Sequence, residues 1–518
     1  MKTKARGFYI GLMFEEAAAV HGNSPVVLDQ PLQLAPAEGT TVTVGRLAAL
    51  VRRLSAQLHA AGIRPQDRVV IFKTNNFDIA LLAAAAQWIG AVPALLSPML
   101  PGDTVSQLLR RLEQPWLITD RAMLDRETID LDAARTVLLS AGEALLGTQV
   151  LPDVDGLPEP VAAVPAIHQP AFISHTSGTT GLPKLAIQTP SALWYRLRVQ
   201  KLVASRTWRK ETVALCISFV HARFYSALYM GISYGNPLVV AIDPSPAAIG
   251  GLFREHRPGV VETQPNTFVS WEELAGAPGA PLSSVRYYSA TFDAIHPRTV
   301  QTLLGASKRP RPKFFQLYGQ TETGPVTGNW ISQRKAASVD GRCVGWALPG
   351  TIRLRIVDDD GTPLLRGEVG HIEVRSRTRA TDYLGESDRF AAQLHDGWWR
   401  MGDTGTKDRI GRVHLLDREI DRLEDTDSNL EIEDELMSLL PELREIVIVA
   451  GDHGQPVPVV CTRGDLPLDN ARWKKAIAGR PGLGAPRQLR FDQLPMTATW
   501  KIRRPELVQL LQGGGLDD

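Results

Sequence analysis

The hydrophobic pattern of the first 120 residues alternates between helical and strand periods. In 44–62, leucine and valine recur at helical spacing, and Gly62 ends the segment. Residues 67–72 are typical of a short buried strand, a helix is expected from Phe77, and 91–96 predicts the next strand. This strand–helix–strand order predicts parallel sheets with right-handed crossovers.

The longest apolar stretch of the chain runs through 79–96. Gln87, Gly90 and Pro93 interrupt it, so the stretch predicts a buried helix followed by a strand and not a membrane span. A second round of the alternation begins near Ala171. Its expected strands lie at 212–219, 237–242, 285–288 and 313–317.

The pattern changes after residue 340, where polar and apolar positions alternate with period two between Gly/Asp turns. The strands expected there are 352–357, 370–375 and 411–416. They predict a β-rich subdomain at about 340–417. The fold class is therefore expected to be α/β: a large N-terminal domain, 1–417, contains two layered parallel-sheet subdomains and the β-rich one, and a small α+β domain, 418–518, follows.

Composition and charge narrow the class of protein. At 518 residues the chain is long enough for more than one domain, and 44% hydrophobic with 22% charged residues is typical of a globular protein. With 57 basic and 56 acidic residues the net charge is +1, which gives no global field for nucleic acid or an anionic membrane. We therefore expect no nucleic-acid or membrane partner, and any anion site must be local.

The cysteines and the N-terminus bear on location. Cys216, Cys343 and Cys461 are odd in number and far apart, which disfavours a disulfide framework or a zinc cluster and favours a reducing cytoplasm. No signal peptide is expected, because only a brief apolar run separates the basic start from Glu15 and Glu16.

Residues 174–184 concentrate side chains that can bind a ligand, in the sequence Ser-His-Thr-Ser-Gly-Thr-Thr-Gly-Leu-Pro-Lys. Hydroxyl donors, glycines that permit close backbone approach and one lysine suit a polyphosphate. The spacing is not that of the Walker loop, and a plain Ser/Thr/Gly turn before a strand is the alternative. The candidate phosphate-binding residues are Thr176, Ser177, Gly178, Thr179, Thr180, Gly181 and Lys184.

Ser-Gly-Thr-Thr-Gly-x-Pro-Lys resembles the phosphate loop of the adenylate-forming superfamily, which contains acyl-CoA synthetases, luciferases and the adenylation domains of peptide synthetases. Four more segments resemble motifs of that family in the same order, so the resemblance spans almost the whole chain. They are Tyr-Gly-Gln-Thr-Glu at 318–322, Gly-Trp-Trp-Arg-Met-Gly-Asp at 397–403, Arg418 before the hinge, and Leu-Pro-Met-Thr-Ala-Thr-Trp-Lys at 494–501.

The resemblance implies a two-step reaction. A carboxylate attacks the α-phosphate of ATP to form an acyl-adenylate and pyrophosphate, and a thiol, usually of CoA, then displaces AMP. It also implies that the small C-terminal domain is mobile and rotates between the two half-reactions. ATP/AMP, Mg²⁺ and coenzyme A are the expected cofactors, and a small carboxylic acid or its acyl-adenylate is the expected ligand.

The resemblance also assigns nucleotide-site roles. Thr321 would contact the α-phosphate and Glu322 would hold Mg²⁺, and both count as catalytic; a Thr/Glu pair at a helix N-terminus is the alternative. Asp403 would accept the ribose hydroxyls, or be a turn residue. Lys501 would bridge the attacking carboxylate and the α-phosphate, although it also lies in a basic surface run. The other expected nucleotide contacts are Ser289 and Ala290 on the adenine side, Tyr318 and Gly319, and the hinge residue Arg418.

His221 and Arg223 are the candidate substrate residues, because the family often has an aromatic residue or His beside the acyl pocket. A packed His and a structural, salt-bridged Arg are the alternatives. Amino-acid-activating relatives carry an Asp in this region, whereas 217–235 contains no acid. This argues against an amino-acid substrate.

The chain departs from the family at both half-reaction surfaces. Leu185 replaces the Gly after the loop lysine, Trp500 replaces the Gly before the C-terminal lysine, and Met401 replaces a Thr. The hinge segment 417–427 carries acids where the family has a Lys and a Gly. We interpret these departures as weakening or delegation of one half-reaction.

The sequence therefore predicts an acyl-CoA ligase, an acid–thiol ligase for a non-amino-acid carboxylic acid. The Ala/Arg/Pro-rich composition and the unusual motifs place the expected role in bacterial secondary metabolism. Two alternatives stay open: an acyl-AMP ligase that loads a carrier protein, and a catalytically reduced nucleotide- or acid-binding subunit that works with a partner ligase.

Overall fold

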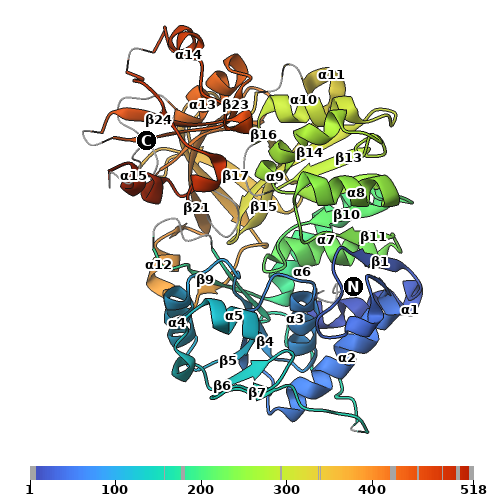
Figure 1. The fold of residues 1–518 in the computed structure, drawn as a ribbon. Coiled ribbons are helices and arrows are strands. Elements are labelled where there is room, and N and C mark those ends of the chain that lie inside the picture. The colour runs from blue at the N-terminus through green and yellow to red at the C-terminus, as the bar shows by residue number, and fades with distance from the viewer. Residues whose placement is uncertain are drawn as a thin grey trace.

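The computed structural model describes residues 7–156, 158–176, 181–291, 295–336, 338, 340–419, 428–451, 454–480, 482–496 and 502–512. Two large sheets and one small sheet are covered by helices (Figure 1). The α/β fold class predicted from the strand–helix alternation is confirmed.

The first sheet has eight strands in the order β19-β9-β8-β4-β3-β5-β6-β7. Its strands pair in parallel from β7 to β8 and antiparallel at β8–β9 and β9–β19. This is the parallel sheet that the first alternating segment predicted. The bounds are β3 (Arg68–Ile71), β4 (Val92–Leu95), β5 (Trp116–Thr119), β6 (Thr136–Leu139), β7 (Gln149–Val150), β8 (Phe172–His175), β9 (Leu185–Gln188) and β19 (Asp382–Tyr383).

The second sheet has 14 strands. Its centre, β14-β13-β12-β10-β11-β1, is parallel, and the pairing becomes antiparallel beyond β14. The bounds are β1 (Pro25–Leu28), β2 (Thr41–Thr43), β10 (Val213–Cys216), β11 (Leu238–Val240), β12 (Val260–Thr263), β13 (Tyr287–Ala290), β14 (Lys313–Gln320), β15 (Gly324–Ser332), β16 (Cys343–Ala347), β17 (Ile352–Val357), β18 (Gly370–Ser376), β20 (Leu394–His395), β21 (Trp398–Lys407) and β22 (Val413–Arg418). The β-rich segment predicted at about 340–417 thus continues this sheet through β15 and β16.

Helices pack between the two large sheets. All 11 residues of α3 (Asp78–Trp88) are buried, as expected for the first half of the apolar stretch. One hydrophobic core contains Val69 of β3 from the first sheet and Val213 of β10 from the second. The same core takes in the buried faces of α2 (Val44–Ala60), α6 (Pro190–Thr207) and α7 (Ala222–Ser233). This shared core holds the two sheets in a fixed relation.

The helices η1 and α1 also contribute to this core, through Ile10, Met13 and Phe14, and further helices follow along the chain. Their bounds are η1 (Ile10–Leu12), α1 (Met13–His21), η2 (Pro36–Glu38), α4 (Gly102–Arg111), α5 (Arg121–Arg126), η3 (Leu131–Ala133), α8 (Pro246–His256), α9 (Pro265–Ser270), η4 (Trp271–Gly276), α10 (Pro297–Ala306), α11 (Gln333–Ala336) and α12 (Ser387–Ala391). None of the helices in the described ranges is long and apolar enough to cross a membrane.

The C-terminal segment builds its own three-stranded sheet, β23-β24-β25. It forms the upper left part of the molecule in Figure 1. Ion pairs join it to the rest of the chain, including Arg342–Glu431 at 2.9 Å and Arg463–Glu272 at 2.9 Å. Its elements are α13 (Asn429–Leu439), β23 (Leu443–Ala450), β24 (Pro456–Thr462), η5 (Arg463–Asp465), α14 (Asn470–Ala476), β25 (Arg487–Gln488), η6 (Phe491–Gln493) and α15 (Arg504–Gln512). The predicted domain division at 417/418 falls inside β22, at its last residue, and stays a prediction.

Candidate active site

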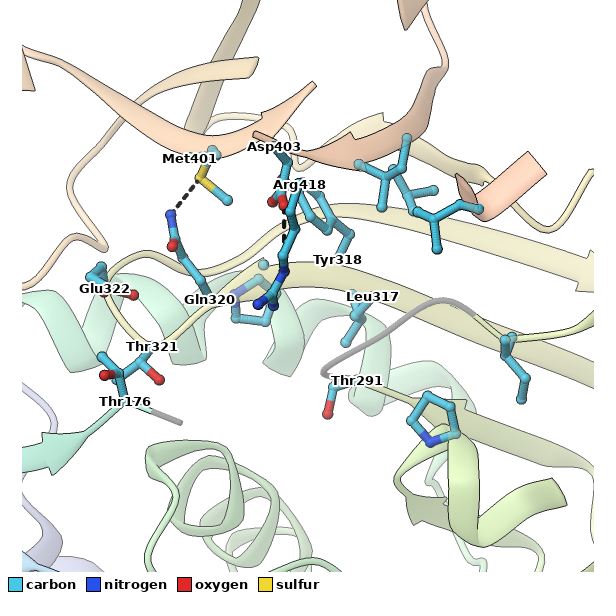
Figure 2. Close-up of a pocket in the computed structure, with 18 of the residues that line it drawn as sticks. Thr176, Thr291, Leu317, Tyr318, Gln320, Thr321, Glu322, Met401, Asp403 and Arg418 are labelled. Carbon is cyan, nitrogen blue, oxygen red and sulfur yellow. Dashed lines mark hydrogen bonds and ion pairs between the residues drawn. The ribbon is translucent and has the colours of Figure 1, made fainter. Parts of the chain in front are cut away.

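A cavity of about 620 Å³ lies where the two large sheets meet the C-terminal segment. Its wall is built by residues that lie far apart in the sequence, among them Thr176, Thr291, Glu322 and Arg418 (Figure 2). The predicted site residues that line it are Thr176, Lys184, His221, Arg223, Tyr318, Gly319, Thr321, Glu322, Asp403 and Arg418. The fold therefore brings together motifs that lie up to 242 positions apart, from Thr176 to Arg418.

The other predicted residues either lie outside the cavity wall or fall outside the described residues. Ser289 and Ala290 are buried, and neither lines the large cavity, whereas Thr291 does. Gly181 also lies outside the cavity wall. Ser177, Gly178, Thr179, Thr180 and Lys501 fall outside the described residues, as does Trp500. The roles that the resemblance assigns to all these residues stay predictions.

The base of the phosphate loop is a short antiparallel ladder between β8 and β9. Thr176 N donates to Lys184 O at 2.9 Å, and Lys184 N donates to Thr176 Oγ1 at 3.1 Å. Gly181 has φ +126°, a conformation that favours glycine, as the loop motif predicts. Leu185 is fully buried in the core beneath the loop, so its added side chain packs there and leaves Lys184 facing the cavity.

Glu322 lines the cavity wall with its side chain 5% exposed. Lys184 Nζ is 3.4 Å from Glu322 Oε1, and Tyr383 Oη donates a hydrogen bond to the same oxygen. Burial, together with the Glu322 carboxylate, raises the pKa of Tyr383, so the phenol keeps its proton and remains a donor. The carboxylate is thus held in place and charge-balanced before any ligand arrives.

This environment can accept Mg²⁺ only in one way. The described residues contain no group of three or more His, Cys, Asp or Glu side chains that could hold a metal. Mg²⁺ is commonly bound by one or two carboxylates together with substrate phosphates and water. One buried carboxylate beside a phosphate loop fits that pattern, so Glu322 would hold Mg²⁺ only in company with the nucleotide.

Arg196 fixes the turn that carries Thr321 and Glu322. Its side chain is buried, and it donates to Thr378 O at 2.8 Å, Thr321 O at 3.0 Å and Glu322 O at 2.9 Å. Burial lowers the pKa of Arg196 to about 9, so the guanidinium remains charged at neutral pH. Gln188 Nε2 supports the same turn through Thr321 O at 3.1 Å. Sequence reasoning missed Arg196 and Gln188, because nothing local signals a contact more than 120 positions away.

Gly319 is required by the hairpin of β14 and β15. A Cβ atom at this position would lie 2.1 Å from Gly324 O, which no side chain can occupy. The neighbouring Gln320 amide lies 3.1 Å from the Met401 sulfur, a weak acceptor (Figure 2). In the opposite amide orientation it donates to Glu322 Oε2 at 3.3 Å.

Asp403 and Arg418 face each other across β21 and β22. Tyr318 Oη donates to Asp403 Oδ2 at 2.6 Å, and Arg418 Nε is 3.9 Å from Asp403 Oδ1 (Figure 2). Burial, and then the Asp403 carboxylate, raise the pKa of Tyr318, so it stays a hydrogen-bond donor. A carboxylate with two acceptor oxygens, held at the cavity edge, suits a diol such as ribose.

Two histidines meet near the loop. His175 accepts from Ser97 N at Nε2, 3.1 Å, and its Nδ1 bonds Thr176 O at 2.8 Å, which fixes a neutral tautomer. Burial, together with His175, lowers the pKa of His221 to about 3. Both rings are therefore neutral at pH 7, and His221 brings no positive charge to the cavity.

The C-terminal segment closes the remaining side. Asp417 accepts hydrogen bonds from Asn429 N at 3.1 Å and Leu430 N at 3.4 Å, and so anchors the start of α13 to the end of β22. Ile502 and Arg504 line the cavity, and Lys501, which precedes them in the sequence, lies outside the described residues. Sequence reasoning missed the Asp417 anchor, because nothing local signals that this carboxylate binds backbone N–H groups 12 and 13 positions along the chain.

Comparison with known proteins agrees with this arrangement. The family model described as "AMP-binding enzyme" matches residues 14–384. A 3-amino-2-hydroxy-4-methoxybenzoate diazotase of Streptomyces cremeus is 52% identical, over 99% of this chain and 97% of that protein. A 3-aminoavenalumate diazotase of a Streptomyces species is 25% identical over 79% of this chain and 74% of its own length.

Among solved structures, a benzoate CoA ligase from Burkholderia xenovorans superposes with a TM-score of 0.80. It covers 96% of this chain and 99% of its own at 19% identity, so it supports the fold alone.

Proposed function

We propose that this chain, which belongs to the AMP-binding enzyme family, is an ATP-dependent diazotase that acts on the amino group of an aromatic acid. The family resemblance that the five motifs indicated is confirmed, and an enzyme of the adenylate-forming type follows from it. The observation that carries the finer proposal is the 52% identity to one diazotase over nearly the full length of both chains. The second diazotase among the relatives supports it.

Diazotisation fits adenylate-forming chemistry without a new cofactor. The second nitrogen of a diazo group must arrive in the oxidation state of nitrite, and nitrite is a small oxyacid anion like a carboxylate. In the first step a nitrite oxygen attacks the α-phosphorus of ATP, the bond to the β-phosphate bridge breaks, and pyrophosphate leaves. The product is a mixed anhydride of nitrite and AMP.

In the second step the aromatic amine replaces the thiol. Its nitrogen attacks the nitroso nitrogen, the N–O bond to AMP breaks, and AMP leaves with one oxygen of nitrite. The nitrosamine loses a proton, shifts its second proton to oxygen, and expels hydroxide to give the diazonium group. No external oxidant or reductant is needed, because the two nitrogens comproportionate.

The described residues can serve the first step as they would serve adenylation of a carboxylate. Lys184 and Glu322 would hold the polyphosphate and its Mg²⁺, and Asp403 would hold the ribose. Two anions must meet at the α-phosphorus, and Lys501, which lies outside the described residues, would offset their repulsion during attack. Nothing in this step requires a channel for the pantetheine arm of CoA.

The proposal also gives a reason for the departures at the thiol side. An amine acceptor makes no demand on the hinge Lys and Gly that 417–427 lacks. The predicted acyl-CoA ligase, the acyl-AMP ligase with a carrier protein and the reduced subunit with a partner ligase are the competing functions. CoA as a cofactor and a cytoplasmic location stay predictions.

The test is a reaction panel on the purified chain with Mg-ATP. The proposal predicts that pyrophosphate exchange requires nitrite alone. It also predicts that AMP release and formation of a trapped azo dye require nitrite together with an aminohydroxybenzoate. Exchange that requires only the aromatic acid, followed by thioester formation with CoA, would establish the ligase instead.

A further inference from the structure

The proposed function sets a demand on the orientation of the substrate. In an acid–thiol ligase the carboxylate must reach the α-phosphate, whereas in a diazotase the amine must reach the activated nitrite. An aminobenzoate that entered with its carboxylate toward the nucleotide would compete with nitrite for adenylation. A site for the carboxylate away from the phosphates would prevent this.

Arg223 lies in the first turn of α7 and lines the large cavity. Its side chain is only 9% exposed, and its Nε and Nη2 both donate to the Glu262 carboxylate, the latter at 2.5 Å. Its third nitrogen, Nη1, is buried and has no hydrogen-bond partner in the described part of the chain. Glu262 thus holds one edge of the guanidinium, and the other edge keeps an unused donor.

The surroundings of Arg223 favour an anion. The first turn of a helix carries free N–H groups and the positive end of the helix dipole, and His221, Ala222 and Arg223 at this turn all line the large cavity. Glu262 is fully buried on β12, and it accounts for the Arg223 charge in the absence of a ligand. A buried N–H without a hydrogen-bond partner costs free energy, so a ligand that accepts a hydrogen bond from Nη1 removes this cost and binds more tightly.

A second space lies behind Arg223. It measures about 30 Å³ and shares Gln200, Arg223 and Leu317 with the wall of the large cavity. This is the volume of about one water molecule, so the aromatic ring must lie in the large cavity. Gln200 Oε1 is a buried acceptor without a partner in the described ranges, which suits a phenolic hydroxyl.

We propose that Arg223, oriented by Glu262, binds the carboxylate of the aromatic substrate through its free Nη1 edge. The ring then spans the large cavity and its amino group faces the nucleotide side. This inference rests on the proposed diazotase function. Arg223 sets the orientation and the specificity of the substrate and takes no part in bond making.

The first experiment compares two substrates, an aminohydroxybenzoate and the aminophenol that lacks its carboxyl group, in the wild-type chain. The expected kcat/KM preference for the benzoate is on the order of 100-fold, as for a buried charge-assisted contact. The test variant is Arg223→Gln combined with Glu262→Gln, because Arg223→Gln alone would leave a buried carboxylate unpaired. The double variant should reduce the preference to a few-fold, mainly through KM for the benzoate.

The matched control is Arg198→Gln, the same substitution at an exposed position on the neighbouring helix α6. It should keep the wild-type preference. The proposal would be overturned by a double variant that is folded, as judged by a cooperative thermal unfolding transition, and that still prefers the benzoate on the order of 100-fold.

A second measurement needs no variant. In the wild-type chain 2-hydroxybenzoate, which has no amine, should compete with the substrate at least 10-fold better than phenol does. Equal inhibition by the two compounds would refute the carboxylate site. Nitrite-dependent pyrophosphate exchange in the same preparation tests the diazotase function separately, since it needs no aromatic substrate; its absence would overturn both proposals together.

Discussion

The role of Arg196 can be tested by Arg196→Met, which removes the charge and the three hydrogen bonds but keeps an apolar stem of similar length. The guanidinium donates to the carbonyl oxygens of Thr321, Glu322 and Thr378 at 2.8 to 3.0 Å. Hydrogen bonds from a charged donor contribute about 1.5 to 3 kcal/mol each, and an unsatisfied buried carbonyl costs about 1 to 3 kcal/mol.

The loss of stability should be smaller than the sum of these hydrogen-bond energies, because other donors remain. Thr321 O keeps a bond from Gln188 Nε2, and Glu322 O keeps one from Ala380 N at 2.6 Å. Within the described ranges, Thr378 O receives no second hydrogen bond. One carbonyl is therefore left unsatisfied, two are weakened, and the penalty for burying a charge disappears. We expect the free energy of unfolding to fall by about 2 to 4 kcal/mol.

Function should suffer more than stability. The same bonds set the positions of Thr321 and Glu322, and a shift of about 1 Å at a reacting group can reduce activity by about 100-fold. The assays are urea unfolding and the Kd for Mg-ATP, with Arg198→Met as the exposed control two positions along the same helix. If Arg196→Met matched Arg198→Met in both assays, Arg196 would not support the turn.

Three further predictions address other parts of the site. Asp403→Ala should raise KM for ATP by about 10- to 100-fold, because two charge-assisted hydrogen bonds are lost; steady-state kinetics with varied ATP measures it, and an unchanged KM would argue against a ribose contact. Lys501→Ala should slow nitrite-dependent pyrophosphate exchange by orders of magnitude and spare attack of the amine on a preformed adenylate, and equal loss in both steps would contradict its assigned role. Burial raises the pKa of Asp417 from 3.8 to about 6, so the folded state holds this proton more tightly than the unfolded state and stability should fall as pH rises between these values. Asp417→Asn should flatten that slope in unfolding curves taken from pH 4 to 7, and a slope as steep as that of the wild type would exclude Asp417 as its source.

Local sequence patterns predicted the elements and the family well. The helix expected over 44–62 is α2, and the apolar stretch at 79–96 is the buried α3 followed by β4, because periodicity reports directly on which faces are covered. Glycine motifs were informative for the same local reason: at Gly319 the backbone of the facing strand leaves no room for a side chain.

Contacts across the fold could not be predicted in this way. Arg196 and Tyr383 reach the Thr-Glu motif from 125 positions before it and 61 positions after it, and neither lies in a recognisable pattern. The predicted adenine contacts, Ser289 and Ala290, show a second limit of sequence reasoning. Successive residues of a strand face opposite sides of the sheet. Ser289 of β13 therefore lines the small cavity behind Arg223, while Ala290 packs in the hydrophobic core that contains Phe268 and Phe314.

The interpretation of the departures also changed with the structure. Leu185 was one of the departures interpreted as weakening a half-reaction, yet its side chain is accommodated in the core and Lys184 still reaches Glu322. The acidic hinge, which argued against a thiol acceptor, is compatible with an amine acceptor. Five family motifs led to the prediction of an acyl-CoA ligase, but the resemblance assigns those motifs to the nucleotide, and they do not identify the acid that is activated.

The central claim is that nitrite, and not the aromatic carboxylate, attacks the α-phosphorus. The most direct measurement is mass spectrometry of the AMP released when the purified chain turns over an aminohydroxybenzoate with Mg-ATP and ¹⁸O-labelled nitrite. The account predicts that one labelled oxygen appears in AMP, and that none appears when the label is placed in the carboxylate of the aromatic acid instead. Unlabelled AMP from labelled nitrite, with label transferred from the carboxylate, would contradict it.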